Sequence, residues 1–232
     1  MEEQNITPNQ ELFAVIAKKN HLKHEVNEQT EEVFEMLKTS ASSIIAEMRR
    51  LQKENNKKFD PKFEYVNRNI YEFELRFSSD VLLFTKHTNI FEFSRNHDLM
   101  KTSYIKENKD RSYCGVIHIY NFLADSILYN RENDLGYLIG RVFVNKEKHC
   151  FIEGKQELGL LFNNFNTTVM TSEMSDNLMR SAMLYSSNFD LLTPPYDAIK
   201  EMSVGEIQSE LSNMSMATGK RMGFKFQADQ MV

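Results

Sequence analysis

The chain has 232 residues, of which 41% are hydrophobic and 11% aromatic, enough apolar material to build a folded core. Its formal net charge at pH 7 is -5, which does not favour a nucleic-acid partner or an anionic membrane, since both usually require a basic surplus. Two cysteines are too few for the disulfide framework of a small secreted protein. The first residues do not have the pattern of a signal peptide, and no apolar run reaches the roughly 18 residues of a membrane span. We therefore expect a cytoplasmic protein with reduced thiols and no membrane partner.

The first quarter of the chain is expected to be helical. Thr7 is a suitable N-cap, Pro8 fits the first helical position and Gln10 completes a capping box. A short helix should begin here and end at the polar stretch 18–21, which predicts a break. A longer helix should follow over residues 22–55, which contain no glycine and no proline.

The apolar residues of the longer helix recur at alternating steps of three, four and seven, which is the spacing of a coiled-coil or helix-bundle seam. The seam comprises Leu22, Val26, Val33, Leu37, Ala41, Ile44, Met48 and Leu51. At about 1.5 Å per residue the helix would be roughly 50 Å long, so part of the seam should extend beyond a small domain. We favour self-association of this arm, residues 1–58, over the alternative that the seam packs on the protein's own sheet. The residues expected to carry the contact between copies are Val33, Leu37, Ile44, Met48 and Leu51.

Residues 59–214 are expected to form a single α+β domain built on a central antiparallel sheet of about five or six strands. The first strand is marked by apolar and charged residues that alternate from Tyr71 to Phe77, the period of a half-buried strand. With the two short strands that follow, it should form a meander, and the last two strands should form a hairpin around the turn 145–148. The further strands expected are 81–85, 90–93, 114–120, 135–144 and 149–153.

Helices are expected over residues 122–129 and in the C-terminal third, where they should pack on one face of the sheet. The C-terminal helices expected are 158–165, 172–185 and 195–214. Residues 95–111 are polar and should form a long surface loop with at most one helical turn. A small-ligand sensor would need a pocket between this loop and the sheet. The tail 215–232 is expected to be mobile or to become ordered on a partner.

The sharpest catalytic signal is the pair Glu153 and Lys155, which lie two apart on an expected strand and therefore point to one face. This spacing resembles the Glu-x-Lys half of the restriction-endonuclease-like nuclease motif, in which an additional Asp helps to hold Mg²⁺ and position water. Asp134 is the candidate for that role. Pairing around the hairpin turn would set Glu153 opposite positions 140–141 and leave Asp134 about 20 Å away, too far to share a metal. A metal-dependent nuclease or phosphodiesterase is therefore the alternative function, and Mg²⁺ the cofactor only in that case.

Two further sets of candidate metal ligands have unsuitable geometry. His21 and a second histidine three residues later have helical spacing, but the lysines around them would repel a cation. A strand would hold Cys114 and His118 about 13 Å apart, and the adjacent His149 and Cys150 would point to opposite faces. We therefore expect no zinc site, and each cysteine should behave as a small apolar residue.

The last candidate is the C-terminal tail, where basic and aromatic residues interleave in a pattern that can bind nucleic acid. These residues are Lys220, Arg221, Phe224, Lys225 and Phe226. Three basic residues are few, and an ordinary polar tail has the same composition. The function we favour from the sequence is a non-enzymatic interaction or sensory module. It would form homo-oligomers or dock another protein through its N-terminal arm, without a cofactor.

Overall fold

The computed structural model describes residues 7–55, 61–131, 134–155, 157–160, 164–188, 195–201 and 203–205. Its longest element is α1 (Pro8–Asn55), one unbroken helix of 48 residues. The predicted break at 18–21 is wrong, because these polar side chains are helix-compatible and simply remain in solvent. The predicted capping box is present: the Thr7 N–H donates to Gln10 Oε1 at 2.8 Å, and the Gln10 N–H donates to Thr7 Oγ1 at 3.4 Å.

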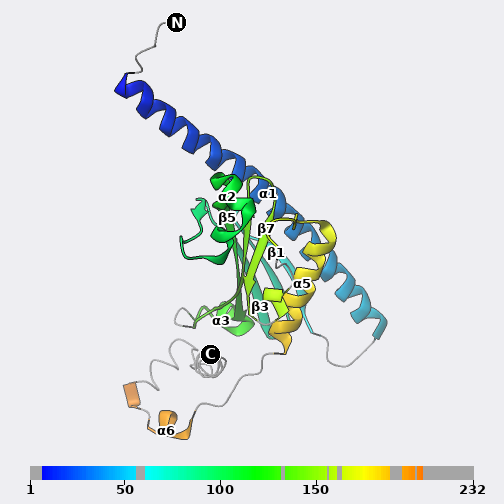
Figure 1. The fold of residues 1–232 in the computed structure, drawn as a ribbon. Coiled ribbons are helices and arrows are strands. Elements are labelled where there is room, and N and C mark those ends of the chain that lie inside the picture. The colour runs from blue at the N-terminus through cyan, green and yellow to red at the C-terminus, as the bar shows by residue number, and fades with distance from the viewer. Residues whose placement is uncertain are drawn as a thin grey trace, which may run out of the picture.

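One antiparallel sheet of seven strands forms the centre of the protein, in the order β1-β2-β3-β5-β6-β7, with β4 paired to β5 (Figure 1). The strands are β1 (Phe63–Asn67), β2 (Glu72–Phe77), β3 (Asp80–Lys86), β4 (Phe91–Glu92), β5 (Tyr113–Leu123), β6 (Tyr137–Asn145) and β7 (Cys150–Gly154). The predicted α+β class, the antiparallel sheet and the β6–β7 hairpin are confirmed. β1 is absent from the predicted strands because this edge strand is only half buried and shows little apolar alternation.

β4 is not the third strand of a meander, and that prediction is wrong. Lys86 at the end of β3 pairs with Ile117 of β5, and Phe91 at the start of β4 pairs with Cys114 of the same strand. Ile117 and Cys114 lie three positions apart on β5, whereas Lys86 and Phe91 lie five positions apart. The chain therefore has two extra residues here, and residues 87–90 leave the line of the strand in an excursion. β4 therefore continues the line of β3 along β5, and the excursion forms a turn on this line.

The inner face of the sheet, defined as the face toward α1, carries the main core of the protein (Figure 1). α5 (Ser172–Ser187) lies beside α1 and contributes to the same core. The largest side chains that this core buries completely belong to α1 and the strands. They include Phe34, Leu37 and Ile45 of α1, and Phe73, Phe84, Leu75, Leu82, Ile117, Ile119, Ile139 and Ile152 of the sheet.

Polar contacts tie α1 to the sheet at both ends of the buried stretch. Lys23 donates from Nζ to Asn89 Oδ1 at 3.0 Å, in the turn 87–90. Glu31 pairs with Lys86, whose side chain is 7% exposed and lies over the rings of Phe34 and Tyr71. Burial lowers the pKa of this lysine.

The C-terminal end of α1 is also held to the sheet. Arg49 Nε donates to the Phe63 carbonyl at 2.7 Å, and Gln52 Nε2 donates to the Pro61 carbonyl at 2.9 Å.

The outer face of the sheet is covered in part by the segment between β4 and β5. Where a long loop was predicted over 95–111, the chain forms three short helical elements, η1 (Asp98–Lys101), α2 (Ser103–Glu107) and η2 (Lys109–Ser112). Tyr104 and Ile105 of α2 pack with Cys114, Val116 and Phe143 of the sheet in a second, smaller core. One end of the outer face is therefore buried, and the predicted polar loop is a packed element.

The remaining helices are short in the described residues. α3 (Ala124–Leu128) confirms the helix predicted over 122–129, while α4 (Glu157–Leu160) and α6 (Tyr196–Ile199) cover only parts of two predicted C-terminal helices. Residues 200–201 and 203, which the predicted helix 195–214 includes, are not helical, and residues 206–214 and the tail 215–232 lie outside the described residues. In the part of the chain that the structure describes, no helix combines the length and the apolar character that crossing a membrane requires.

Gly115 of β5 lets α1 approach the sheet closely. A Cβ at this position would lie 2.1 Å from Thr30 Oγ1 and 2.9 Å from Thr30 Cβ, distances that no side chain can occupy without a shift of the helix or the strand. The Thr30 hydroxyl itself donates to the Val26 carbonyl of its own helix at 2.7 Å, so the polar group in the seam is satisfied within α1. Thr30 therefore fits a position that the predicted seam leaves without an apolar residue.

We expect Gly115→Ala to lower the free energy of unfolding by about 1–3 kcal/mol, because the added methyl group overpacks the contact between α1 and β5. Gly140→Ala in β6 is the matched control, since its Cβ would lie 3.6 Å from the nearest atom, an ordinary van der Waals contact. Chemical denaturation of both variants measures the difference. An equal cost for the two substitutions would contradict the close approach at Gly115.

Candidate functional site

The structure places the predicted oligomerisation residues in or beside the protein's own core. Val33 and Leu37 are 0% exposed and Ile44 is 4% exposed, all three against the inner face of the sheet. Met48 and Leu51 are half-buried further along α1. The alternative interpretation of the seam, packing on the protein's own sheet, therefore holds for Val33, Leu37 and Ile44. The physical reason is that the stripe has the width of an ordinary core-facing helix stripe, and the sheet supplies its partner.

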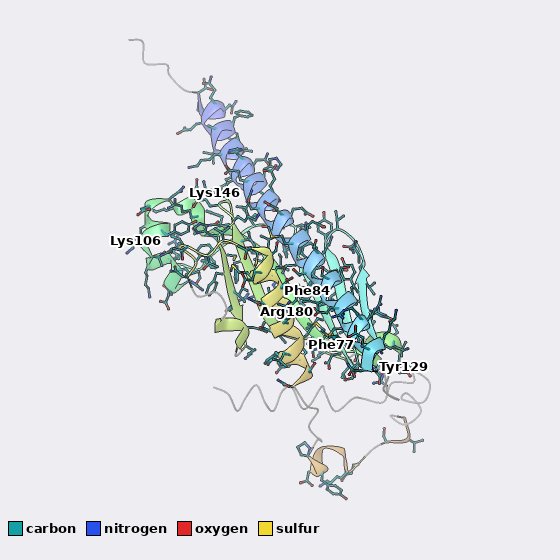
Figure 2. All side chains as sticks on the ribbon, turned by 90° about the vertical axis from the view of Figure 1, so that its right-hand side faces the viewer. Phe77, Phe84, Lys106, Tyr129, Lys146 and Arg180 are labelled. Atoms are coloured by element: carbon teal, nitrogen blue, oxygen red, sulfur yellow. The ribbon has the colours of Figure 1, made fainter. Side chains whose placement is uncertain are left out.

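The apolar residues that remain uncovered lie further toward the N-terminus of α1. Every described residue from Thr7 to His21 is exposed, and the first buried residue of the helix is Leu22. Figure 2 shows these first turns and their side chains standing clear of the sheet and of α5. We call this segment, Pro8–His21, the protruding arm. It is shorter than the predicted arm 1–58, because the side chains of α1 from Val33 to Ile45 belong to the main core of the domain.

Four large apolar side chains are exposed on the protruding arm. Their exposed fractions are 59% for Leu12, 73% for Phe13, 53% for Val15 and 57% for Ile16. Leu12 and Val15 lie ten and seven residues before Leu22, so they extend the heptad seam of the buried stretch beyond the edge of the sheet. Single exposed apolar residues are ordinary, but a contiguous group on one helix face marks an interaction surface.

The charges on the arm have a simple order. Glu11 precedes the apolar residues, and Lys18 and Lys19 follow them. Glu11 and Lys18 are seven residues apart, which places them on the same flank of the helix, two turns from each other. The flank therefore carries opposite charges at its two ends, with the apolar group between them.

The three candidate nuclease residues do not form one site, because Asp134 lies apart from Glu153 and Lys155. Glu153 pairs across the hairpin with Arg141, as the predicted register requires, and its Oε2 accepts from Arg141 Nε at 2.7 Å. Asp134 lies before β6, where its Oδ2 accepts from Ser126 Oγ of α3 at 2.6 Å. Lys155 follows β7 and is exposed, next to the Glu153–Arg141 pair. Among the residues that the structure describes, no three His, Cys, Asp or Glu side chains form a group that could hold a metal ion.

The two cysteines lie on opposite faces of the sheet. Cys150 belongs to the main core on the inner face, and Cys114 belongs to the smaller core on the outer face. Both are free and fully buried. Burial raises the pKa of Cys150 to about 12 and raises that of Cys114 as well, so neither thiol is activated as a nucleophile.

A small-ligand sensor would need a pocket between the sheet and the 95–111 segment, and the described cavity nearest to that place includes only His97 of the segment. A cavity of about 480 Å³ lies on the outer face, between β5–β6–β7 and the residues around β4 and His97. Its polar lining includes His118 and the pair Arg141 and Glu153. From the sequence, His118 is a candidate only for a zinc site and Glu153 only for a nuclease site, and Arg141 is not a candidate. Their proximity depends on the register of β5 against β6, which no local motif in the sequence reveals.

No protein-family model, no curated protein and no solved structure matches this chain. The exposed apolar arm and the outer-face cavity are therefore the features from which its function is inferred.

A pair of identical substitutions tests the division of α1 into a buried and an exposed part. We expect Leu37→Ala to lower the free energy of unfolding by about 2–5 kcal/mol, because it leaves a cavity in the core. Leu12→Ala on the same helix should change it by less than about 0.5 kcal/mol. Denaturation at low protein concentration, which keeps any association out of the measurement, gives both values. Similar costs at the two positions would contradict this division.

The burial of the thiols predicts their reactivity. In the native protein Cys114 and Cys150 should react with a disulfide reagent such as DTNB far more slowly than free cysteine, and both should react fully after denaturation. The measurement is the number of protein thiols that react with DTNB, counted with and without denaturant. A fast-reacting thiol in the native state would show that one of the two sites opens.

Proposed function

We propose that this protein is a non-enzymatic interaction module that pairs with a second copy of itself through the protruding arm. The observation that carries the proposal is the group of four exposed apolar side chains on a helix that is otherwise packed into the domain. Covering these side chains removes apolar surface from water, which favours association by roughly 25 cal/mol for each Å² buried. The arm needs no rearrangement of the domain to make this contact.

The charge order of the arm favours a second copy in antiparallel orientation. If the two arms cross between Ala14 and Val15, Glu11 of one copy meets Lys18 of the other. The same crossing brings Phe13 of each copy to Ile16 of its partner, so the apolar groups cover one another. Two-fold symmetry repeats each contact, and an isologous interface of this kind is the commonest in homo-oligomers. Antiparallel helices bring like flanks together, which is the arrangement that the opposite charges on one flank require.

The size of the contact predicts its strength. The protruding arm has about four turns and a length of about 20 Å. Two such segments offer less surface than the about 1,600 Å² of a standard stable interface. We therefore expect a reversible dimer that dissociates on dilution. The net charge of -5 and the free buried thiols fit a protein-binding role in a reducing, cytoplasmic compartment and do not favour nucleic acid as the partner.

The arm is tested by placing charges on its apolar face. The double variant Phe13→Asp with Ile16→Asp should be monomeric at concentrations at which the unmodified protein dimerises, because the interface would bury unpaired carboxylates. Ala14→Glu, an exposed substitution on the opposite face of the arm, is the control and should leave the dimer intact. Sedimentation velocity over a range of concentrations measures the mass. An unmodified protein that stays monomeric throughout would overturn the proposal.

Charge reversal distinguishes self-pairing from docking of a different protein. Glu11→Lys and Lys18→Glu should each raise the dimer dissociation constant about three- to tenfold, because each creates two repulsive contacts across the two-fold axis. The double variant Glu11→Lys with Lys18→Glu should restore the original value, since the pairs re-form with their signs exchanged. If the single variants have no effect, or if the double variant is weaker than either, the arms do not cross as proposed.

A further inference from the structure

The open part of the outer face carries a polar row between two apolar rows. Thr85, His118, Arg141 and Glu153 lie opposite one another across β3, β5, β6 and β7. The row on the side of α2 consists of Val116, Phe143 and Phe151, and the row on the other side consists of Leu83, Tyr120 and Leu138. A helix or loop could pack over an uninterrupted apolar face without burying any polar side chain. A polar row at this level is therefore a departure from the pattern of the sheet, and such departures concentrate at functional sites.

A groove is built over this row. It is the cavity of about 480 Å³ described above, with Phe91, Phe93 and His97 on the side of β4 and η1, and with Phe143 beside the polar row. A second cavity of about 280 Å³ shares Arg141 and Glu153 with it and extends to Lys155. Small-molecule sites typically have volumes of about 300–1,000 Å³, so the groove has a suitable size for a small ligand.

Two histidines of the groove have their proton positions set by neighbouring backbone. His87 Nδ1 accepts from the Asn89 N–H at 3.0 Å, and His97 Nδ1 accepts from the Leu99 N–H at 3.2 Å. A nitrogen that accepts a hydrogen bond carries no proton, so in both rings the proton is on Nε2. Each ring therefore offers one N–H donor away from its backbone turn. Both rings also contact phenylalanines, His87 with Phe91 at 4.7 Å and His97 with Phe93 at 4.9 Å between centroids.

Arg141 supplies the fixed positive charge among the described lining residues. Its guanidinium is paired with Glu153 and lies 5.3 Å from the centroid of Phe143, and its side chain is still 38% exposed. His118, opposite Arg141, has its pKa lowered by burial and then by the charge of Arg141. Glu153 accepts from Arg141 Nε and Nη2, so Nη1 is the nitrogen of this guanidinium that remains to donate to a ligand. Glu92, the other acidic residue of the described lining, hydrogen-bonds Tyr113.

We propose that the groove binds a small anion with a flat aromatic body, in which a carboxylate or phosphate group is attached to an aromatic ring system. The anionic group would accept hydrogen bonds from Arg141 and from the Nε2–H groups of His87 and His97, and guanidinium–oxyanion bonds are among the stronger hydrogen bonds in proteins. The aromatic body would lie against the phenylalanine rings, where ring–ring contacts favour a flat ligand. The groove is on the outer face and the protruding arm is not part of it, so this binding does not depend on pairing of the arms.

The test uses two anions that share this chemistry, benzoate and AMP, added to the full-length protein. Amide ¹H–¹⁵N spectra should show shifts concentrated at residues 87–97, 118 and 141, and titration calorimetry gives the affinity. Adenosine, which lacks the anion, and inorganic phosphate, which lacks the ring, should bind more weakly than AMP.

Arg141→Gln should reduce the affinity for these anions about tenfold or more, because it removes the charged donor. Arg180→Gln, on α5 at the other side of the sheet (Figure 2), should leave it unchanged.

Each outcome decides the proposal. Binding of benzoate alone would assign an aryl carboxylate, and binding of AMP alone would assign a nucleotide, provided that Arg141→Gln weakens it. Failure of both anions to bind at millimolar concentration would overturn the proposal, as would binding that Arg141→Gln leaves unchanged or shifts that lie outside the groove. Thermal unfolding of Arg141→Gln should match that of the unmodified protein, since the pair with Glu153 is half exposed and contributes little to stability.

Discussion

The packing of α1 on the inner face of the sheet is the contact on which the rest of the structure depends. The stretch from Leu22 to Ile45 contains the buried residues of the helix, and at about 1.5 Å per residue it spans roughly 36 Å. The whole helix of 48 residues is about twice that length. The helix is longer than the part of the sheet that it crosses. The turns that precede Leu22 therefore extend beyond the sheet and have no part of the domain to pack against. The close approach at Gly115 and the polar contacts of Lys23, Glu31 and Arg49 fix where the helix crosses the sheet and therefore where the arm emerges.

Much of the fold follows from local patterns, and the exceptions have identifiable physical causes. Alternation from Tyr71 to Phe77 predicts β2. The turn 145–148 predicts the β6–β7 hairpin and places Glu153 opposite position 140 or 141, and the structure pairs it with Arg141. The path of β4 is not predictable in this way, because it depends on which strand accepts its hydrogen bonds. The seam of α1 is a similar case. Its spacing predicts a buried stripe but not the partner, since a sheet and a second helix both accept a stripe of that width. The arm could have been located from the four apolar residues before His21, but the expected break at 18–21 assigned them to a separate short helix.

The outer-face groove illustrates a different limit. His118, Arg141 and Glu153 come from three strands, and they share one face because the register across β5, β6 and β7 places them in one row. A shift of one residue in either pairing would move a side chain of the row to the inner face, into the main core. The backbone turns that orient His87 and His97 are likewise products of the path of the chain, since the first lies in the excursion between β3 and β4. The same excursion contains Asn89, which accepts the hydrogen bond from Lys23 of α1. The turn 87–90 therefore contributes to one wall of the groove and also contacts α1 where the arm leaves the domain.

One helix therefore has two segments with different physical roles, and the boundary between them is Leu22. C-terminal to it, the side chains of the buried stripe are in contact with the core of the domain in every folded molecule, so their substitution changes the free energy of unfolding. N-terminal to it, side chains are in water in the monomer and make contacts only when another surface covers them, so their substitution changes the free energy of association. The continuity of the helix connects these roles mechanically, because an unbroken backbone holds the arm at a fixed angle to the sheet. An arm with that fixed direction loses less conformational freedom on pairing than a flexible segment of the same composition, and a short apolar surface gains affinity from such preorganisation.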